Sequence, residues 1–189
     1  MSGAPTAPEV ADRALVLYAL ARRASIELAL EELRNDPVRI AQAERARVET
    51  DRWLDRESLR AAVLPHEDAL FAAPSGTWPH EAVVDGLWRR EALAVLLWAG
   101  GHLDLLPRFG DEADPHVLDD AITRHGAVGV FRSLTWIRPE ADLERAFQES
   151  DAWFAATEDR EGNDATLASI SAERVRALSW LRDRDAARA

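Results

Sequence analysis

Histidine and aspartate side chains between residues 102 and 120 are the residues in this sequence best suited to chemistry. His116 and Asp120 are four residues apart, so on a helix they share one face with Asp119. A histidine and a carboxylate one turn apart can hold two positions around a divalent cation, with His102 or the acidic loop as a third ligand. The spacing therefore predicts a metal site formed by His102, His116, Asp119 and Asp120.

A second interpretation of the same segment needs no ligand. Six carboxylates lie between Asp104 and Asp120, against one cation, Arg108. A solvated acidic loop with aspartates that cap a helix explains this composition, and His125 falls among apolar positions, where it would pack. The sequence contains no HExxH motif, no GxSxG nucleophile motif and no GxGxxG phosphate loop. We therefore predict no bound cofactor, with a divalent metal as the alternative.

Two charged residues fall on helix faces that are otherwise apolar. On the helix expected over residues 79–99, Glu91 lies between Trp88 and Val95 on the apolar stripe. Arg174 lies in the apolar stripe of the last helix. Because a lone buried carboxylate is costly, we predict that Glu91 is buried and paired with Arg174. The pair would fix the register of the helices; alternatively, Glu91 and Trp88 line a cleft or a small-molecule pocket.

Tryptophan is frequent for a chain of 189 residues, with seven Trp against one Tyr and five Phe. Trp78 lies in a loop before Pro79, and Trp180 lies opposite the apolar stripe of the last helix. An exposed tryptophan is typical of an anchor for a partner protein. Packing within the same domain is the competing interpretation of both residues.

The remaining pattern is helical almost throughout. Thr6 and Glu9 have the spacing of a capping box, and the helix that they begin ends near Asn35. The apolar run at 127–137 fits either a helix or a strand. Further helices are expected at 37–54, 57–63, 65–73, 79–99, 114–126, 139–156 and 171–185, with loops at 74–77, 102–114 and 158–164. We predict an all-α fold, a single domain over 1–189 with its core at about 9–182, built as an irregular bundle of six to eight helices.

Composition excludes several classes of function. All 23 basic residues are arginine and there is no cysteine, which excludes lysine Schiff bases, P-loop lysines, thiolate nucleophiles and disulfides. The formal net charge of −11 disfavours nucleic-acid binding, which needs phosphate neutralisation. There is neither a long apolar run nor a basic flank followed by an apolar stretch near Met1. We therefore expect no membrane segment and a cytoplasmic location.

Several segments resemble one family. The sequence WRREAL at 88–93, followed by LLWAG at 96–100, resembles the central signature of the domain-of-unknown-function 4272 family. Weaker matches in the same order are RAL at 13–15, WL at 53–54, LPHE at 64–67, RPE at 138–140 before Trp153, and ER…ALSWL at 173–181. The resemblance implies a bacterial, mostly helical, single-domain protein and carries no catalytic residues. The family's Trp-Asp-rich tail is replaced here by Arg182-Asp183-Arg184-Asp185.

These observations favour a non-enzymatic helical protein-interaction module of the immunity, antitoxin or regulatory kind. Its acidic middle would recognise a basic protein partner. Two alternatives stay open: a small metal-assisted hydrolase built on the region from His102 to Asp120, and a helical pocket for a small molecule near Glu91.

Overall fold

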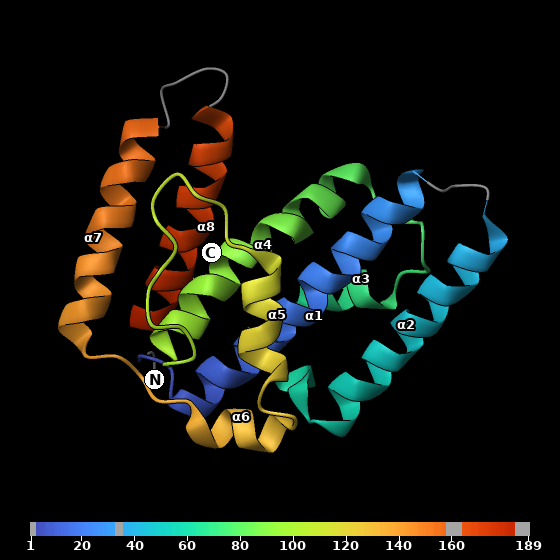
Figure 1. Ribbon diagram of the computed structural model, residues 1–189, viewed down its shortest axis with the longest axis horizontal. Helices are drawn as coiled ribbons and strands as arrows, with labels where there is room; N and C mark the ends of the chain where they lie inside the picture. Colours follow the sequence, from blue (N-terminus) through green and yellow to red (C-terminus); the bar gives the residue numbers. More distant parts are fainter. Residues whose placement is uncertain (1–2, 33–35, 158–163, 184–189) are drawn as a thin grey trace. The chain divides into compact units, whose positions relative to one another are not determined.

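The computed structural model describes residues 3–32, 36–157 and 164–183 (Figure 1). Within these residues the chain forms eight α-helices and one short 3₁₀ helix, and no strand. The predicted all-α fold is thus confirmed. By packing, the chain divides into two units, one formed by residues 1–14 and 90–189 (unit 1) and one by residues 15–89 (unit 2). Helices α1 and α4 each contribute residues to both units.

Unit 2 is built from helical segments whose ends follow from local sequence. They are α1 (Ala7–Glu32) from residue 15 on, α2 (Pro37–Arg56), the 3₁₀ helix η1 (Leu59–Ala62), α3 (Pro65–Ala72) and α4 (His80–Ala99) up to residue 89. The Asp36 side chain caps α2 by accepting hydrogen bonds from the backbone N–H groups of Val38 and Arg39. The Glu67 carboxylate accepts one from Leu64 N at 3.0 Å and so closes the start of α3.

A glycine sets the distance between α1 and α4 in unit 2. A Cβ atom at Gly86 would lie 2.7 Å from the Cβ of Ala24 and 3.2 Å from the indole of Trp78. The two helices therefore approach too closely for any side chain at position 86, although glycine costs helix stability in a helix interior.

Unit 1 has the second part of α4 at its centre. All ten residues from Glu91 to Gly100 are buried. Around them lie α5 (Pro115–Thr123), α6 (Val128–Leu134), α7 (Glu140–Thr157) and α8 (Asp164–Arg182), with the first residues of α1. Helices α7 and α8 run side by side in Figure 1. A stretch of irregular chain from Gly100 to Asp114 connects α4 to α5.

Most expected helices are present, with small differences at their ends. The ambiguous run at 127–137 is helical from Val128 to Leu134 and irregular after it. The last helix begins at Asp164, before the expected start at 171, and Ile170 in this earlier part is 1% exposed. Residues 158–163 of the loop expected at 158–164, the helix end at Asn35 and the end of the last helix beyond Asp183 fall outside the described residues, whereas Asp164 is helical. In the part of the chain that is described, none of the helices has the length and apolar character needed to cross a membrane.

Candidate functional site

The structure brings Glu91 of α4 and Arg174 of α8 together inside unit 1. Arg174 Nε and Nη2 donate to Glu91 Oε2 at 3.0 and 2.8 Å, and both side chains are 2% exposed or less. The other carboxylate oxygen, Oε1, accepts from the backbone N–H of Ala113 at 2.6 Å. Trp88 lies one turn before Glu91 on α4 and is half-buried.

Arg174 also holds the irregular connection between α4 and α5. Its Nη1 donates to the carbonyl oxygens of Pro107 at 3.0 Å and Arg108 at 3.2 Å, and its Nη2 donates to Asp111 O at 2.9 Å. The guanidinium carbon lies 5.7 Å from the ring centroid of Phe109. All five N–H donors of the guanidinium are thus engaged, two by Glu91 and three by the connection.

This geometry favours a structural role for the pair. A carboxylate that acts as a base needs a lone pair within reach of its substrate, but Glu91 is 2% exposed and its two oxygens accept hydrogen bonds from Arg174 and Ala113. The pair joins α4 to α8 and fixes the path of residues 107–113 between them. A pocket for a small molecule beside Glu91 gains no support from these contacts.

A second buried polar cluster forms around His102, directly after α4. His102 is 5% exposed, and its ring stacks on Phe131 of α6 with centroids 4.0 Å apart and an interplanar angle of 10°. Its Nδ1 lies 3.2 Å from His125 Nε2, and its Nε2 lies 2.8 Å from Thr135 Oγ1. The cluster ties the end of α4 to both ends of α6.

The hydrogen bonds of this cluster define the tautomers of both histidines. The Thr135 hydroxyl donates its only proton to Phe131 O at 2.9 Å, so Thr135 Oγ1 must accept from His102 Nε2–H. Neutral His102 then accepts at Nδ1, and His125 donates from Nε2. If His102 Nδ1 were also protonated, two N–H donors, His102 Nδ1–H and His125 Nε2–H, would point at each other without an acceptor.

The surroundings of His102 keep it neutral. Burial, and after it the charges of His125 and Arg124, lower the pKa of His102 from 6.5 to about 4. Arg124 also donates from Nη2 to the backbone oxygen of His102. His102 is therefore uncharged at neutral pH, and acid is expected to break its contact with His125.

The predicted metal-binding group is not formed among the described residues. His116, Asp119 and Asp120 are exposed on α5, whereas the buried ring of His102 is hydrogen-bonded to His125 and Thr135. Across residues 3–32, 36–157 and 164–183, no three or more His, Asp or Glu side chains gather in a way that could hold a metal ion. The acidic residues of this region have local roles instead; Asp114, for example, caps α5 by accepting from His116 N at 2.8 Å.

Unit 2 contains a second buried ion pair, which the sequence analysis missed. Arg23 and Glu27 lie one turn apart on α1, are 3% and 1% exposed, and are joined by a bond of 2.9 Å from Arg23 Nε to Glu27 Oε1. Glu27 Oε2 accepts from Gly76 N at 2.8 Å, and Arg23 Nη2 donates to Ala73 O at 3.0 Å. The pair thus fixes the loop between α3 and α4, as Glu91 and Arg174 fix the connection in unit 1.

The sequence feature that indicates this pair is the same as for Glu91: charged residues on an otherwise apolar helix face. On the helical wheel, positions 23 and 27 fall among Leu20, Ala24 and Leu30, all of which are buried. One difference between the two pairs is visible: Arg23 Nη1 is buried without a hydrogen-bond partner in the described part of the chain, whereas every donor of Arg174 is used.

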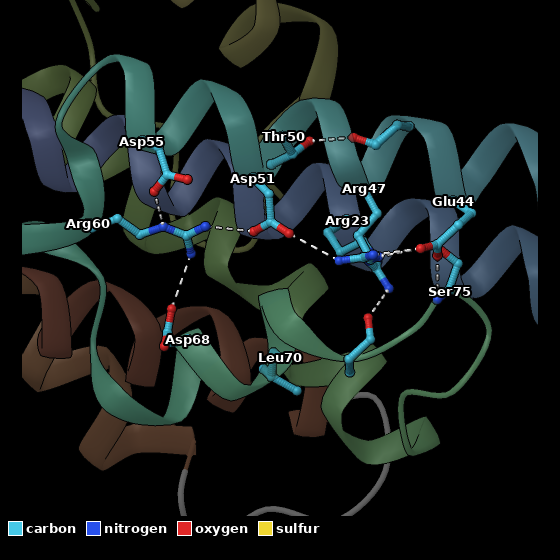
Figure 2. Close-up of polar contacts among 12 residues, drawn as sticks. Arg23, Glu44, Arg47, Thr50, Asp51, Asp55, Arg60, Asp68, Leu70 and Ser75 are labelled. Atoms are coloured by element: carbon cyan, nitrogen blue, oxygen red, sulfur yellow. Dashed lines mark hydrogen bonds and ion pairs between the residues drawn. The ribbon is translucent and has the colours of Figure 1, made fainter.

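Charged side chains also link α2 to the rest of unit 2 (Figure 2). Arg60 of η1 binds three carboxylates: Asp51 and Asp55 of α2, both at 2.8 Å, and Asp68 of α3 at 3.1 Å. Farther along α2, Arg47 Nη1 reaches Asp51 at 3.0 Å. We call Arg60 and its three carboxylates the Arg60 cluster.

The row of charges continues from Arg47 to Glu44 and the loop before α4. Glu44 Oε1 accepts from Arg47 Nη2 at 2.6 Å, and Glu44 Oε2 accepts from the backbone N–H of Ser75 at 3.1 Å. The hydrogen bond from Arg47 is the main cause that lowers the pKa of Glu44 from 4.5 to about 2. Glu44 is therefore ionised throughout the neutral range.

The two tryptophans predicted as partner anchors are not the most exposed ones. Trp78 is 6% exposed, and its Nε1 donates to Leu70 O at 2.9 Å, so it packs within unit 2. Trp180 is half-buried on α8. Trp136 and Trp153 are instead 48% and 42% exposed, and Trp153 stacks on Phe109 with centroids 5.6 Å apart.

An uncharged surface follows α6. Val130 and Leu134 lie on one face of this helix and are 45% and 52% exposed, and Trp136 follows two residues later. We call these three residues the α6 surface. The exposed residues from 126 to 136 are all uncharged: Gly126, Ala127, Gly129, Val130, Ser133, Leu134 and Trp136. The one charged residue of that stretch, Arg132, bonds to Asp12 of α1 at 2.6 Å.

The chain matches the family model described as "Domain of unknown function (DUF4272)" over residues 3–188. It belongs to this family. A search of the curated proteins and a search of the solved structures found no match.

In this DUF4272 domain, the segments that carry the family resemblance supply the buried ion pair of unit 1. WRREAL contains Glu91, and the ER…ALSWL segment contains Arg174. The two segments are more than eighty residues apart in sequence and meet at the centre of unit 1. The segments that resemble the family thus include the residues that join α4 to α8, and they do not include the residues of the α6 surface.

Substitution of Gly101 tests the position of Trp136 in this DUF4272 domain. Gly101 has φ +78°, and a Cβ atom there would overlap the indole ring of Trp136. We expect Gly101→Ala to lower the free energy of unfolding by about 2 kcal/mol, from left-handed backbone strain and displacement of the indole. Urea unfolding followed by tryptophan fluorescence measures the change. Gly126→Ala is the control, because Gly126 has φ +69° with open space around its Cβ position; an equal loss in both variants would contradict the packing of Trp136 on Gly101.

Proposed function

We propose that this DUF4272 domain is a non-enzymatic protein-interaction module that binds a basic protein partner through the α6 surface. The observation that carries the proposal is that Val130, Leu134 and Trp136 are exposed along a stretch, 126–136, whose exposed residues are all uncharged, in a chain with a net charge of −11. Contiguous apolar residues rimmed by polar ones are typical of protein-binding surfaces, and tryptophan is enriched among their anchors.

The charge of the neighbouring helix indicates the kind of partner. Asp119 and Asp120 are exposed on α5, and Asp114 is exposed at the N-cap of this helix, which precedes α6 by four residues. A partner that presents apolar side chains to α6 and arginine or lysine to α5 would match both surfaces, and the opposite charges would speed its association. An immunity, antitoxin or regulatory role agrees with such a module.

The buried charged residues support a binding function over catalysis. Glu91, Arg174, Glu27 and Arg23 all bond to the backbone of the loops beside them. The predicted metal residues on α5 lie apart from His102. A metal-assisted hydrolase is therefore less well supported than a binding module.

The proposal is tested by capturing partners from the source cells with three versions of the tagged chain. Leu134→Ser should reduce recovery of the main partner about tenfold or more, since losing one buried leucine contact weakens binding by about 1.4 kcal/mol or more. Val38→Ser, at a residue 61% exposed on α2, is the matched control and should leave recovery unchanged.

The captured partner should also be basic, and its recovery should fall as NaCl is raised from about 50 to 300 mM. Urea unfolding of each variant shows whether the fold is kept. Equal recovery by wild type and Leu134→Ser, or a partner of acidic charge, would overturn the proposal.

A further inference from the structure

Helix α2 differs from the other long helices in how little of it is buried. Of its twenty residues only Ala43 and Leu54 are buried, and every residue from Pro37 to Gln42 is exposed. In α1, by contrast, buried apolar residues recur from Val10 to Leu30, with the paired Arg23 and Glu27 among them. Apolar packing alone therefore gives α2 only a small part of the stabilisation that holds α1 in place.

Ion pairs, more than apolar contacts, join α2 to η1 and α3. Arg60 joins two carboxylates of α2, Asp51 and Asp55, to Asp68 of α3, and its Nε, Nη1 and Nη2 each take one carboxylate. A network in which one planar guanidinium bridges two helices is stronger than isolated surface pairs of the same exposure.

The cluster is also open to solvent and salt. The side chain of Arg60 is 35% exposed, and those of Asp55 and Asp68 are 65% and 62% exposed. Arg174 in unit 1, at 0% exposed, is shielded from such screening. Ion pairs at this degree of exposure weaken as ionic strength rises, whereas buried pairs are affected much less.

We propose that Arg60 is a charge-dependent latch that holds α2 on the rest of unit 2, and that α2 detaches as one element when the latch is broken while α1 stays folded. Detachment would expose Leu54 and Leu59, both of which are 0% exposed when α2 is in place. Ionic strength would thus control the exposure of Leu54 and Leu59. This effect is independent of the α6 surface.

Hydrogen–deuterium exchange of the intact chain, read by mass spectrometry, tests the latch. Arg60→Gln should exchange about tenfold faster in peptides of α2 (Pro37–Arg56), with peptides from residues 15–31 of α1 unchanged. Arg56→Gln is the matched control: it removes the same charge from a residue 67% exposed that is paired with the adjacent Glu57, and it should match wild type.

The wild-type chain provides a second readout that needs no variant. Raising NaCl from about 0.05 to 0.5 M should speed exchange in α2 toward the rate of Arg60→Gln and leave residues 15–31 unchanged. Faster exchange of α1 together with α2 would overturn the proposal, as would unchanged exchange of α2 in Arg60→Gln or in high salt.

Discussion

Replacing Arg174 with methionine is expected to lower the free energy of unfolding by about 3–5 kcal/mol, the largest effect of any single substitution considered. The change leaves the carboxylate of Glu91 buried without its cation, and removing one partner of a buried pair carries a cost of this size. It also leaves the carbonyl oxygens of Pro107, Arg108 and Asp111 without the donors that they have now. Urea unfolding at pH 7 measures the loss.

A double substitution separates the two causes. Glu91→Met with Arg174→Met removes both charges and keeps similar volumes, so it should recover part of the stability lost in Arg174→Met. Recovery should be incomplete, because the backbone groups of the connection, including Ala113 N, still lack partners. If Arg174→Met costs less than about 1 kcal/mol, the pair does not hold the connection as described.

The second large effect is a loss of stability in mild acid that depends on His102. The pKa of His102 is lowered from 6.5 to about 4, so the unfolded chain binds a proton that the folded chain does not. The contribution of His102 is complete above pH 6.5 and is lost as pH falls from 6.5 to 4. The full loss is about 3 kcal/mol, of which about 2 kcal/mol should already be missing at pH 5.

Two variants assign this acid step to His102. His102→Phe keeps a ring beside Phe131 and removes the titrating group, so the step between pH 7.5 and 5 should disappear. His116→Phe, at an exposed position on α5, should keep the step. The depressed pKa of Glu44, about 2, acts in a separate window, because its contribution is lost only as pH falls from 4.5 to 2. An acid step of the same size in His102→Phe would show that another group is responsible.

The sequence predicts helix positions well where single residues define the ends. Asp36 and Pro37 at α2, and Asp114 and Pro115 at α5, begin helices through a side-chain cap and a fixed φ angle, both of which are local effects. The run at 127–137 could not be assigned, because short apolar runs suit a helix and a strand equally well. Phe131 of this helix contacts the rings of His102 and His125. The apolar pattern of residues 127–137 carries no information about these contacts.

The residues of the site were predictable only where burial was visible on a helical wheel. Glu91 and Arg174 interrupt apolar stripes, and that conflict identified both of them. Arg23 and Glu27 were missed because an arginine and a glutamate four residues apart are usually a surface pair. His102 lies apart from the acidic face of α5 for a tertiary reason: its partner is His125, 23 residues away in sequence.

We propose that this DUF4272 domain binds its partner through the α6 surface. The most direct measurement places a photo-crosslinking residue at position 134 in the chain expressed in its source cells, with position 38 on α2 as the matched exposed site. Mass spectrometry of the products identifies what is joined to each position. We predict that one basic protein is crosslinked at position 134 and is absent from the products of position 38. The same products from both positions, or none from position 134, would contradict it.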